Sequence, residues 1–335
     1  MENKMVMQLP VTESQLAAII IFCISVNGFV LNTIVGLFTR KLKTMNNPFG
    51  RLMASQATGE AALSAVFAFY FSPMVFFDVK AMKDHSRHAG WINLIAYDIC
   101  IWSHLFVALN RMCAIVFPLK YDRYFSVKNT TRFIVVSWII PIVTAIVLYK
   151  VYDCDLYYID TFWVFGFSNN PVCNFISWNI DFYKDISIVV VIAVVDSITI
   201  IEVHRAQKRT ASSTTAQQIQ RRRREVNFLK QAVFQGIVFV IELLTYFIFA
   251  WWFTDKKWVV FSMTTLAWNI VHTVDPIITI CFNREFRKFF ASPKFMLYTL
   301  QSILSGKPSV YPESVGHSSS HPAGSVNRIQ ERSSQ

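Results

Sequence analysis

Polar and charged side chains interrupt several long apolar stretches of this 335-residue chain. In a membrane, a charged side chain at the centre of a helix costs about 2.5 to 3.5 kcal/mol, whereas each Leu, Ile, Phe or Val stabilises by about 0.3 to 0.6 kcal/mol. Such residues usually face the interior of a helix bundle and serve a switch, an ion or a ligand, whereas those near a helix end are simply hydrated. The residues are Asn32, Glu60, Asp98, His104, Arg111, Asp196, Glu242, His272 and Asp275.

The elements that must position these side chains are seven mostly apolar stretches of about 20 to 28 residues, separated by polar loops. About 20 residues of helix cross a hydrocarbon core of roughly 30 Å, and the backbone there must satisfy its own hydrogen bonds as helix. With 53% hydrophobic and 16% charged residues, the composition disfavours a soluble domain. We predict an all-α membrane protein, a seven-transmembrane helix bundle, with spans at 16–39, 49–77, 89–116, 131–150, 183–203, 229–253 and 257–282.

The distribution of basic residues predicts the orientation of the bundle. Most of the 32 Lys and Arg residues fall in loops that are cytoplasmic if the N-terminus is extracellular. This agrees with the positive-inside rule, so the net charge of +11 reflects topology, and we expect no nucleic-acid partner. The basic flank of the first stretch, Arg40 and Lys41, follows it, which is the reverse of a cleaved signal peptide. We expect a multi-pass plasma-membrane protein with its C-terminus in the cytoplasm.

The chain divides into three predicted regions. Residues 1–15 form a short extracellular tail, 16–290 the seven-helix domain, and 291–335 a disordered cytoplasmic tail rich in Ser, Pro, Gly and His. Residues 283–290 are typical of a short amphipathic eighth helix on the membrane surface. Its basic residues would face headgroups, and the residues expected to face lipid are Phe282, Phe286, Phe289 and Phe290.

Two of the six cysteines, Cys154 and Cys173, fall in an outside loop, where an oxidising environment permits a disulfide. Closing a loop of about 20 residues in this way stabilises the fold by roughly 3 kcal/mol. The bridge would lie within the loop and make it a lid; the alternative is two unpaired thiols. The cysteines show no metal-binding spacing, so we expect no metal and no cofactor.

Three motifs at the ends of the stretches carry a resemblance to a known family. Residues 109–125, LNRMCAIVFPLKYDRYF, resemble the Asp-Arg-Tyr region of rhodopsin-like G-protein-coupled receptors. They are more similar to nematode chemoreceptors of serpentine receptor class X, where Asn-Arg-Phe-Cys-Ala followed by Pro-x-x-Tyr is typical. SQATGEA at 55–61 with FYFSPMVFF at 69–77, and DPIITICFNREFR at 275–287, also resemble that class. The resemblance covers about residues 15–290, and the three motifs together are fairly specific.

The resemblance implies that Arg111 is a cytoplasmic switch residue. Such an arginine pairs with an acid in the inactive receptor and swings toward a G protein when helix 6 moves outward. Asn110 stands where the broader family has an acidic neighbour, so the local partner is missing. Glu225, at the inner start of the sixth span, is the candidate replacement. The alternative is an arginine held only by lipid headgroups.

The resemblance also gives Glu60 the place of a helix 2 aspartate that organises a buried water or sodium cluster, with Asn32 and Asp275 at matching places. Two neighbouring carboxylates would share a proton or hold a cation. An ion- or proton-linked switch and a polar knot that fixes helix packing both remain open. Pro276 allows a kink, but Thr279 replaces the tyrosine of the family's Asn-Pro-x-x-Tyr motif, so the activation geometry differs.

The outer halves of the spans are rich in aromatic rings, which membrane-interface belts explain in part and a mostly apolar ligand pocket explains in part. The candidate pocket residues are Asp98, His104, Glu242 and Trp268. The short N-terminus suits a small molecule or short peptide. On the inner side, basic residues at 205–209 and 221–224 would meet a heterotrimeric G protein or membrane lipid, and tail serines could take phosphate and recruit an arrestin-like protein.

Other functional classes fit the sequence less well. A seven-helix ligand-gated channel or transporter of inverted topology is the main alternative, and the charge distribution opposes it. A retinal-bound pump needs a mid-membrane lysine, which the seventh stretch lacks. Glu60 and Asp275 are the only acidic pair suited to an intramembrane enzyme, and the signatures Gly-x-Gly-Asp and His-Glu-x-x-His are absent. We therefore predict no catalytic residues and a chemosensory G-protein-coupled receptor.

Overall fold

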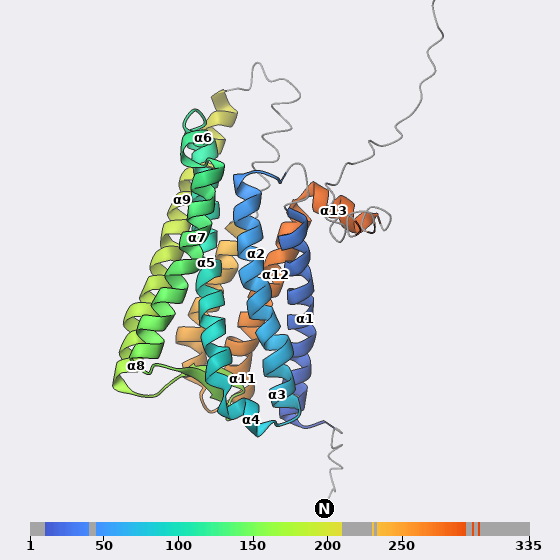
Figure 1. Cartoon of the computed structure of the whole chain (residues 1–335), viewed down its shortest axis with the longest axis vertical. Coiled ribbons are helices and arrows are strands. Elements are labelled where there is room, and N and C mark those ends of the chain that lie inside the picture. Colours follow the sequence, from blue (N-terminus) through green and yellow to red (C-terminus); the bar gives the residue numbers. More distant parts are fainter. Residues whose placement is uncertain are drawn as a thin grey trace, which may run out of the picture.

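The computed structural model describes residues 11–39, 45–209, 230, 233–292, 297 and 301, and these residues form a bundle of long helices (Figure 1). Seven helices are long and apolar enough to cross a membrane, which confirms the predicted fold class. The spans are Glu13–Thr39, Pro48–Phe76, Ser86–Val116, Val127–Val151, Pro171–Arg205, Val233–Phe253 and Lys257–Phe282.

The helices within and between the spans follow the chain order of Figure 1. They are α1 (Glu13–Thr39), α2 (Pro48–Val66), α3 (Ser72–Phe76), α4 (Lys80–Asp84), α5 (Ser86–Val116), α6 (Tyr121–Tyr124), α7 (Val127–Thr144), α8 (Pro171–Phe175), α9 (Tyr183–Arg209), α11 (Lys257–Phe261), α12 (Ala267–Phe282) and α13 (Arg284–Ala291). A two-stranded antiparallel hairpin, β1 (Leu156–Ile159) and β2 (Val164–Phe167), lies at the same end of the bundle as α4 and α11. We call this the hairpin end, and the opposite end the α6 end.

The fifth span begins earlier than its predicted start at residue 183. It starts at Pro171, where the Asn170 side chain accepts a hydrogen bond from the Cys173 N–H at 2.7 Å and caps the helix. Polar residues such as Asn174 and Asp181 lie in the first turns of this span and interrupt its apolar pattern. The sequence analysis therefore placed residues 171–182, which are helical, in the preceding loop.

Five π-helical segments occur in the described spans, and all lie toward the hairpin end. They are Phe67–Phe71, Ala145–Val151, Ile176–Phe182, Thr245–Phe249 and Ser262–Leu266. A π-helical turn widens the helix by one residue and is common at functional sites. The helices are thus irregular at the hairpin end and regular toward the α6 end.

The hairpin packs directly against the end of α5. Gly90 makes this contact possible, because a Cβ atom there would lie 1.9 Å from the backbone oxygen of Leu156. At the hairpin turn, the buried Trp163 ring packs edge-on against Trp258, and the Lys257 ammonium lies 3.5 Å from the Trp163 ring centroid. The hairpin therefore covers the bundle as an attached cap.

The outward faces of the helices are apolar, whereas many polar side chains are buried between them. On α7, the exposed fractions of Val135, Ile139 and Val143 are 46%, 54% and 51%. Glu60 and His272 are fully buried. This arrangement is the one that lipid requires, because only the inward faces can supply hydrogen-bond partners.

The short helix α13 occupies part of the segment predicted as an amphipathic helix. Phe286 and Phe289 are buried, and the Phe289 ring lies 4.2 Å from the Phe38 ring of α1. The expectation that both rings face lipid is therefore wrong, because the end of α1 covers them. Phe290 remains 41% exposed.

Candidate functional site

A cluster of polar side chains from α2, α5 and α12 lies inside the bundle, and we call it the polar core. Its centre is the Gln56 amide, whose Nε2 donates to Glu60 Oε1 at 3.1 Å and to Asp275 Oδ2 at 2.7 Å. The same nitrogen lies 2.9 Å from His104 Nε2. The structure thus brings together Glu60 and Asp275, as the sequence predicted, through an amide that the sequence did not single out.

The polar core holds more acceptors than its amide donor can satisfy. An amide nitrogen carries two hydrogens, but three groups lie within reach of it. Glu60 Oε2 and Asp275 Oδ1 are buried and have no hydrogen-bond partner among the residues that the structure describes. His104 Nε2 lies 3.9 Å from an oxygen of each carboxylate, and these three residues place ligand atoms within 4.8 Å of one another. The arrangement can take up a proton or a cation.

Asn32 stabilises the backbone of α12 at its proline. Pro276 has no N–H, so the His272 carbonyl four residues earlier loses its helical donor. Asn32 Nδ2 on α1 donates to that carbonyl at 2.9 Å. The side chain therefore satisfies an acceptor that the proline leaves open, and it links α1 to the kink-permitting position of α12.

Arg111 lies near the α6 end of α5 and is buried. Its guanidinium carbon is 4.8 Å from the Phe49 ring centroid. Asp196 on α9 and Asp275 on α12 both interact electrostatically with it. Asn110 donates to the Tyr121 hydroxyl at 3.2 Å. Glu225, the predicted partner of Arg111, lies outside the described residues.

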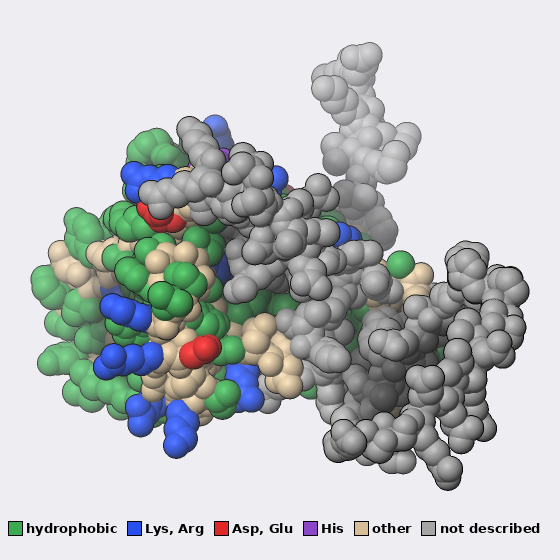
Figure 2. Space-filling view, turned by 90° about the horizontal axis from the view of Figure 1, so that it is seen from above, with side chains coloured by type: hydrophobic (Ala, Val, Ile, Leu, Met, Phe, Trp, Pro, Cys, Tyr) green, Lys and Arg blue, Asp and Glu red, His purple; other side chains and the backbone are tan. Residues whose placement is uncertain are grey.

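The surface of the α6 end is basic. Figure 2 views this end and shows Lys and Arg side chains gathered over the described part, with few Asp and Glu. Four basic side chains of α6 and its neighbours are exposed: Lys120 and Arg123 at α6, and Lys128 and Arg132 in the first turns of α7. The basic segment at 221–224 lies outside the described residues.

At the hairpin end, Lys184 forms an ion-pair cluster with three carboxylates. Its Nζ donates to the two oxygens of Asp98 at 2.7 and 2.8 Å and to Asp181 Oδ1 at 3.0 Å. Asp185 Oδ1 lies 3.5 Å away. The predicted pocket residue Asp98 is therefore occupied in an ion pair whose other members the sequence analysis did not single out.

A narrow, partly open cavity of about 20 Å³ lies beside this ion-pair cluster. Predicted residues Glu242 and Trp268 line it together with Tyr97, whose hydroxyl donates to Glu242 Oε2 at 3.0 Å. His104 is absent from this lining and belongs to the polar core. Two of the four predicted pocket residues therefore meet at the cavity.

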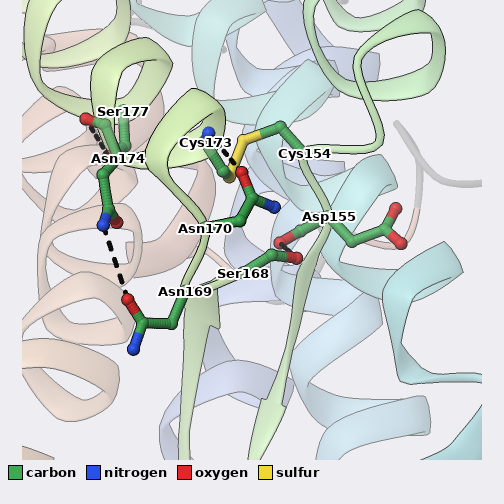
Figure 3. Close-up of a disulfide and its surroundings, with 8 residues drawn as sticks. All are labelled: Cys154, Asp155, Ser168, Asn169, Asn170, Cys173, Asn174 and Ser177. Carbon is green, nitrogen blue, oxygen red and sulfur yellow. Dashed lines mark hydrogen bonds between the residues drawn. A yellow bond between two sulfur atoms is a disulfide. The ribbon is translucent and has the colours of Figure 1, made fainter.

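A disulfide between Cys154 and Cys173 closes the loop that covers the cavity, as the sequence predicted (Figure 3). It joins the start of the hairpin to the first turn of α8. Ser168, just after the hairpin, contacts the residue just before it, because its N–H and its hydroxyl both donate to the Asp155 carbonyl. Leu156 of β1 and Phe167 of β2 line the cavity, so the loop is a lid over it.

A smaller cluster of charges fixes the hairpin turn to α4. Lys83 Nζ and the Tyr158 hydroxyl both donate to Asp160, each at 2.9 Å. Partial burial alone would raise the pKa of Asp160, but these hydrogen bonds outweigh burial and lower that pKa. The side chain of Asp160 is 64% exposed, so its contribution to stability is small.

Some functional side chains were missed because their type or position gave a weak signal. Gln56 carries no charge, so it did not stand out in an apolar stretch. Asp181 and Asp185 were assigned to a loop and a helix start, although their spacing of four residues with Lys184 between them predicts one side of a helix. That spacing is the signal that could have found the cluster.

Comparison with known proteins gives one family over most of the chain. The family described as serpentine type 7TM GPCR chemoreceptor Srx matches residues 22–283. Serpentine receptor class X 45 of Caenorhabditis elegans is 33% identical over 83% of this chain and 81% of its own length. Serpentine receptor class X-43 of the same organism is 26% identical over 80% of this chain and 83% of its own length.

A more distant similarity extends outside the nematode receptors. Melatonin receptor type 1C of Gallus gallus is 27% identical over 40% of this chain and 38% of its own length. Melatonin receptor type 1A of the same organism is 28% identical over 41% of this chain and 39% of its own length.

Proposed function

We propose that this chain, which belongs to the serpentine type 7TM GPCR chemoreceptor family Srx, binds a small molecule or short peptide at its hairpin end and activates a heterotrimeric G protein at its α6 end. The observation that carries this proposal is the difference between the two ends of the bundle. A lidded cavity lies at one end, and a buried arginine with a basic surface lies at the other.

Helix α12 is suited to couple the two ends. It carries Trp268 in the cavity wall and Asp275 in the polar core, seven residues apart, which is about 10 Å along a helix. Pro276 lies next to Asp275 and provides a place at which the helix can bend. A ligand that repositions Trp268 would therefore change the contacts of Asp275 with Gln56, which biases a two-state element.

We assign Arg111 the switch role, with an acidic partner that holds it in the inactive state. Asp196 supports this role because it interacts electrostatically with Arg111, and Glu225 is the second candidate. Asn110 would release Tyr121 when the α6 end rearranges. Outward movement of the sixth span would then expose Arg111 to the G protein.

The basic α6 end fits the cytoplasm, which would place the N-terminus outside the cell in the plasma membrane. On this assignment, residues 1–15 are the extracellular tail, 16–290 the receptor domain and 291–335 a cytoplasmic tail. Phosphorylated serines of that tail would recruit an arrestin-like protein, and the basic surface would also contact lipid headgroups.

We also propose that the polar core responds to a cation or a proton, because Glu60 and Asp275 share one amide donor. Ligand affinity would then change with sodium concentration or pH, and Asp275→Asn would abolish that dependence. Affinity that is equal with and without sodium, and equal across pH, would instead assign these residues to helix packing alone.

The experiment that tests the receptor function is a calcium or cAMP measurement in cells that express the full chain, screened against volatile and soluble metabolites. Arg111→Ala should abolish the response and leave surface delivery unchanged. A tag at the N-terminus should be accessible in intact cells. A protected tag, or a response that persists in Arg111→Ala, would contradict the proposal and favour the inverted channel or transporter.

A further inference from the structure

The cavity at the hairpin end has an unusual electrostatic lining for a space enclosed by membrane helices. Three carboxylate side chains line it, those of Asp181, Asp185 and Glu242. The described residues of the lining include no Lys, Arg or His. Burying a carboxylate is unfavourable unless a positive group or several hydrogen-bond donors stabilise its charge. The lining of this cavity therefore lacks positive charge to balance its carboxylates.

The nearby Lys184 does not supply what is missing. An ammonium carries three hydrogens, and Lys184 donates them to the two oxygens of Asp98 and to Asp181. Asp185 is 1% exposed, and within the described part of the chain its Oδ1 accepts no hydrogen bond, although the Lys184 ammonium lies 3.5 Å away. One ammonium therefore donates hydrogen bonds to two carboxylates and lies 3.5 Å from the third, Asp185, so three carboxylates share a single positive charge.

Within the described part of the chain, the Glu242 carboxylate receives a hydrogen bond only from a neutral donor. It is buried on the sixth span, and the Tyr97 hydroxyl donates to its Oε2. A neutral hydroxyl stabilises a carboxylate less than a charged donor does. Asp185 and Glu242 thus face the same cavity from two different helices. Among the described residues, Asp185 has only the Lys184 ammonium that it shares with two other carboxylates, and Glu242 has only the Tyr97 hydroxyl.

The remaining lining suits a positive group as well. Tyr97, Tyr246 and Trp268 line the cavity, and the ring centroids of Tyr97 and Tyr246 lie 5.7 and 5.9 Å from that of Trp268. Aromatic faces attract ammonium groups, more strongly where water is excluded.

We propose that the ligand of this receptor is a small protonated amine, whose ammonium binds between Asp185 and Glu242 and whose apolar part contacts the three aromatic rings. The inference rests on the proposed function, since it names the class of ligand that the same cavity takes. Lys184 is an internal precedent, because it shows that this region holds an ammonium among carboxylates.

A divalent metal ion is the other cation to consider. Asp98, Asp181 and Asp185 place oxygens within 4.8 Å of one another. The Lys184 ammonium lies within 3.5 Å of all three carboxylates, so it occupies the position that a metal would take. The structure therefore favours the amine, and the metal becomes an outcome of the test.

The test measures binding without signalling. The full chain in lipid nanodiscs is heated with butylamine, 2-phenylethylamine or tryptamine, and with the alcohol and the carboxylic acid matched to each. At least one amine should raise the unfolding temperature more than its alcohol and acid do. No excess for any amine, or a stabilisation given by Ca²⁺ or Zn²⁺ alone, would overturn the inference.

Three variants test where the amine binds and whether negative charge attracts it. Asp185→Asn should weaken amine binding about tenfold, because it removes one charge-assisted contact. Asp153→Asn changes an exposed carboxylate in the loop before the hairpin and should leave binding unchanged. Lys184→Gln should act in the opposite direction and strengthen amine binding, since it leaves more negative charge uncompensated.

A second variant protects the test from a folding failure. If Asp185→Asn is not recovered folded, Glu242→Gln should weaken amine binding in the same way. Unchanged amine binding in the recovered variant, or weaker binding in Lys184→Gln, would refute the site. A receptor that signals to a neutral compound equally well with Asp185→Asn loses this inference but keeps its proposed function. Amine binding without G-protein activation would instead keep this inference and contradict the proposed function.

Discussion

The two ends of the bundle differ in how regular their helices are and in what they bury. At the hairpin end, five π-helical segments widen the helices and a disulfide-closed hairpin covers a narrow cavity lined by carboxylates. Toward the α6 end the described helices are α-helical, and Arg111 is buried near Phe49 and Asp196. The comparison indicates that local irregularity is concentrated where a receptor needs a shaped cavity.

Removing the disulfide should give the largest effect and should separate the two ends. We expect Cys154→Ser to lower the free energy of unfolding by about 3 kcal/mol, because the loop is no longer closed. Hydrogen exchange should rise in residues 156–167 and stay unchanged in 100–116. Cys23→Ser, at an exposed free thiol, is the control. If hydrogen exchange in residues 156–167 were the same in Cys154→Ser as in the wild type, the lid would be independent of the disulfide.

Asn32→Ala tests the link between the two ends at α12. The His272 carbonyl would lose its donor and stay buried, which costs about 1 to 3 kcal/mol. Thermal unfolding in nanodiscs measures this loss. Asn27→Ala on the same helix removes an exposed amide and should cost far less. Equal losses would mean that the proline carbonyl needs no side-chain donor.

Asp196→Asn tests which acid restrains Arg111 at the α6 end. Loss of this electrostatic interaction should raise ligand-independent signalling about fivefold at equal surface expression. Glu225→Gln should give the rise instead if that residue is the partner. Asp122→Asn, at an exposed position of the same end, should give none. If basal activity stays constant in both test variants, neither Asp196 nor Glu225 holds the arginine.

Asp160→Asn should give the smallest effect, at most about 1 kcal/mol, because the carboxylate is largely exposed. The folded protein lowers the pKa of Asp160, so its contribution is present above the ordinary pKa and disappears as pH falls through the lowered value. Thermal unfolding of wild type and variant should therefore differ at neutral pH and converge in strong acid. If the difference between wild type and variant grew as the pH fell, the pKa of Asp160 would be raised by folding and not lowered.

The sequence supported the seven spans because apolar length is a local property. Most boundaries agree within a few residues, but the fifth span starts at Pro171, since Asn174 and Asp181 interrupt its apolar pattern. The disulfide was also predictable, because only Cys154 and Cys173 fall in one outer loop. Phe286 and Phe289 could not be assigned correctly, since the end of α1 that covers them is distant in sequence.

By itself, the sequence determined that lipid surrounds the chain and which residues are too polar to face it. Only the tertiary structure decided how those residues pair. Gln56 donates to Asp275, which is 219 positions away in the chain, and Lys184 donates to Asp98, which is 86 positions away. The physical reason is that insertion depends on the summed transfer energy of consecutive residues, whereas a buried charge is stabilised by whichever partner the packed helices bring within about 3 Å.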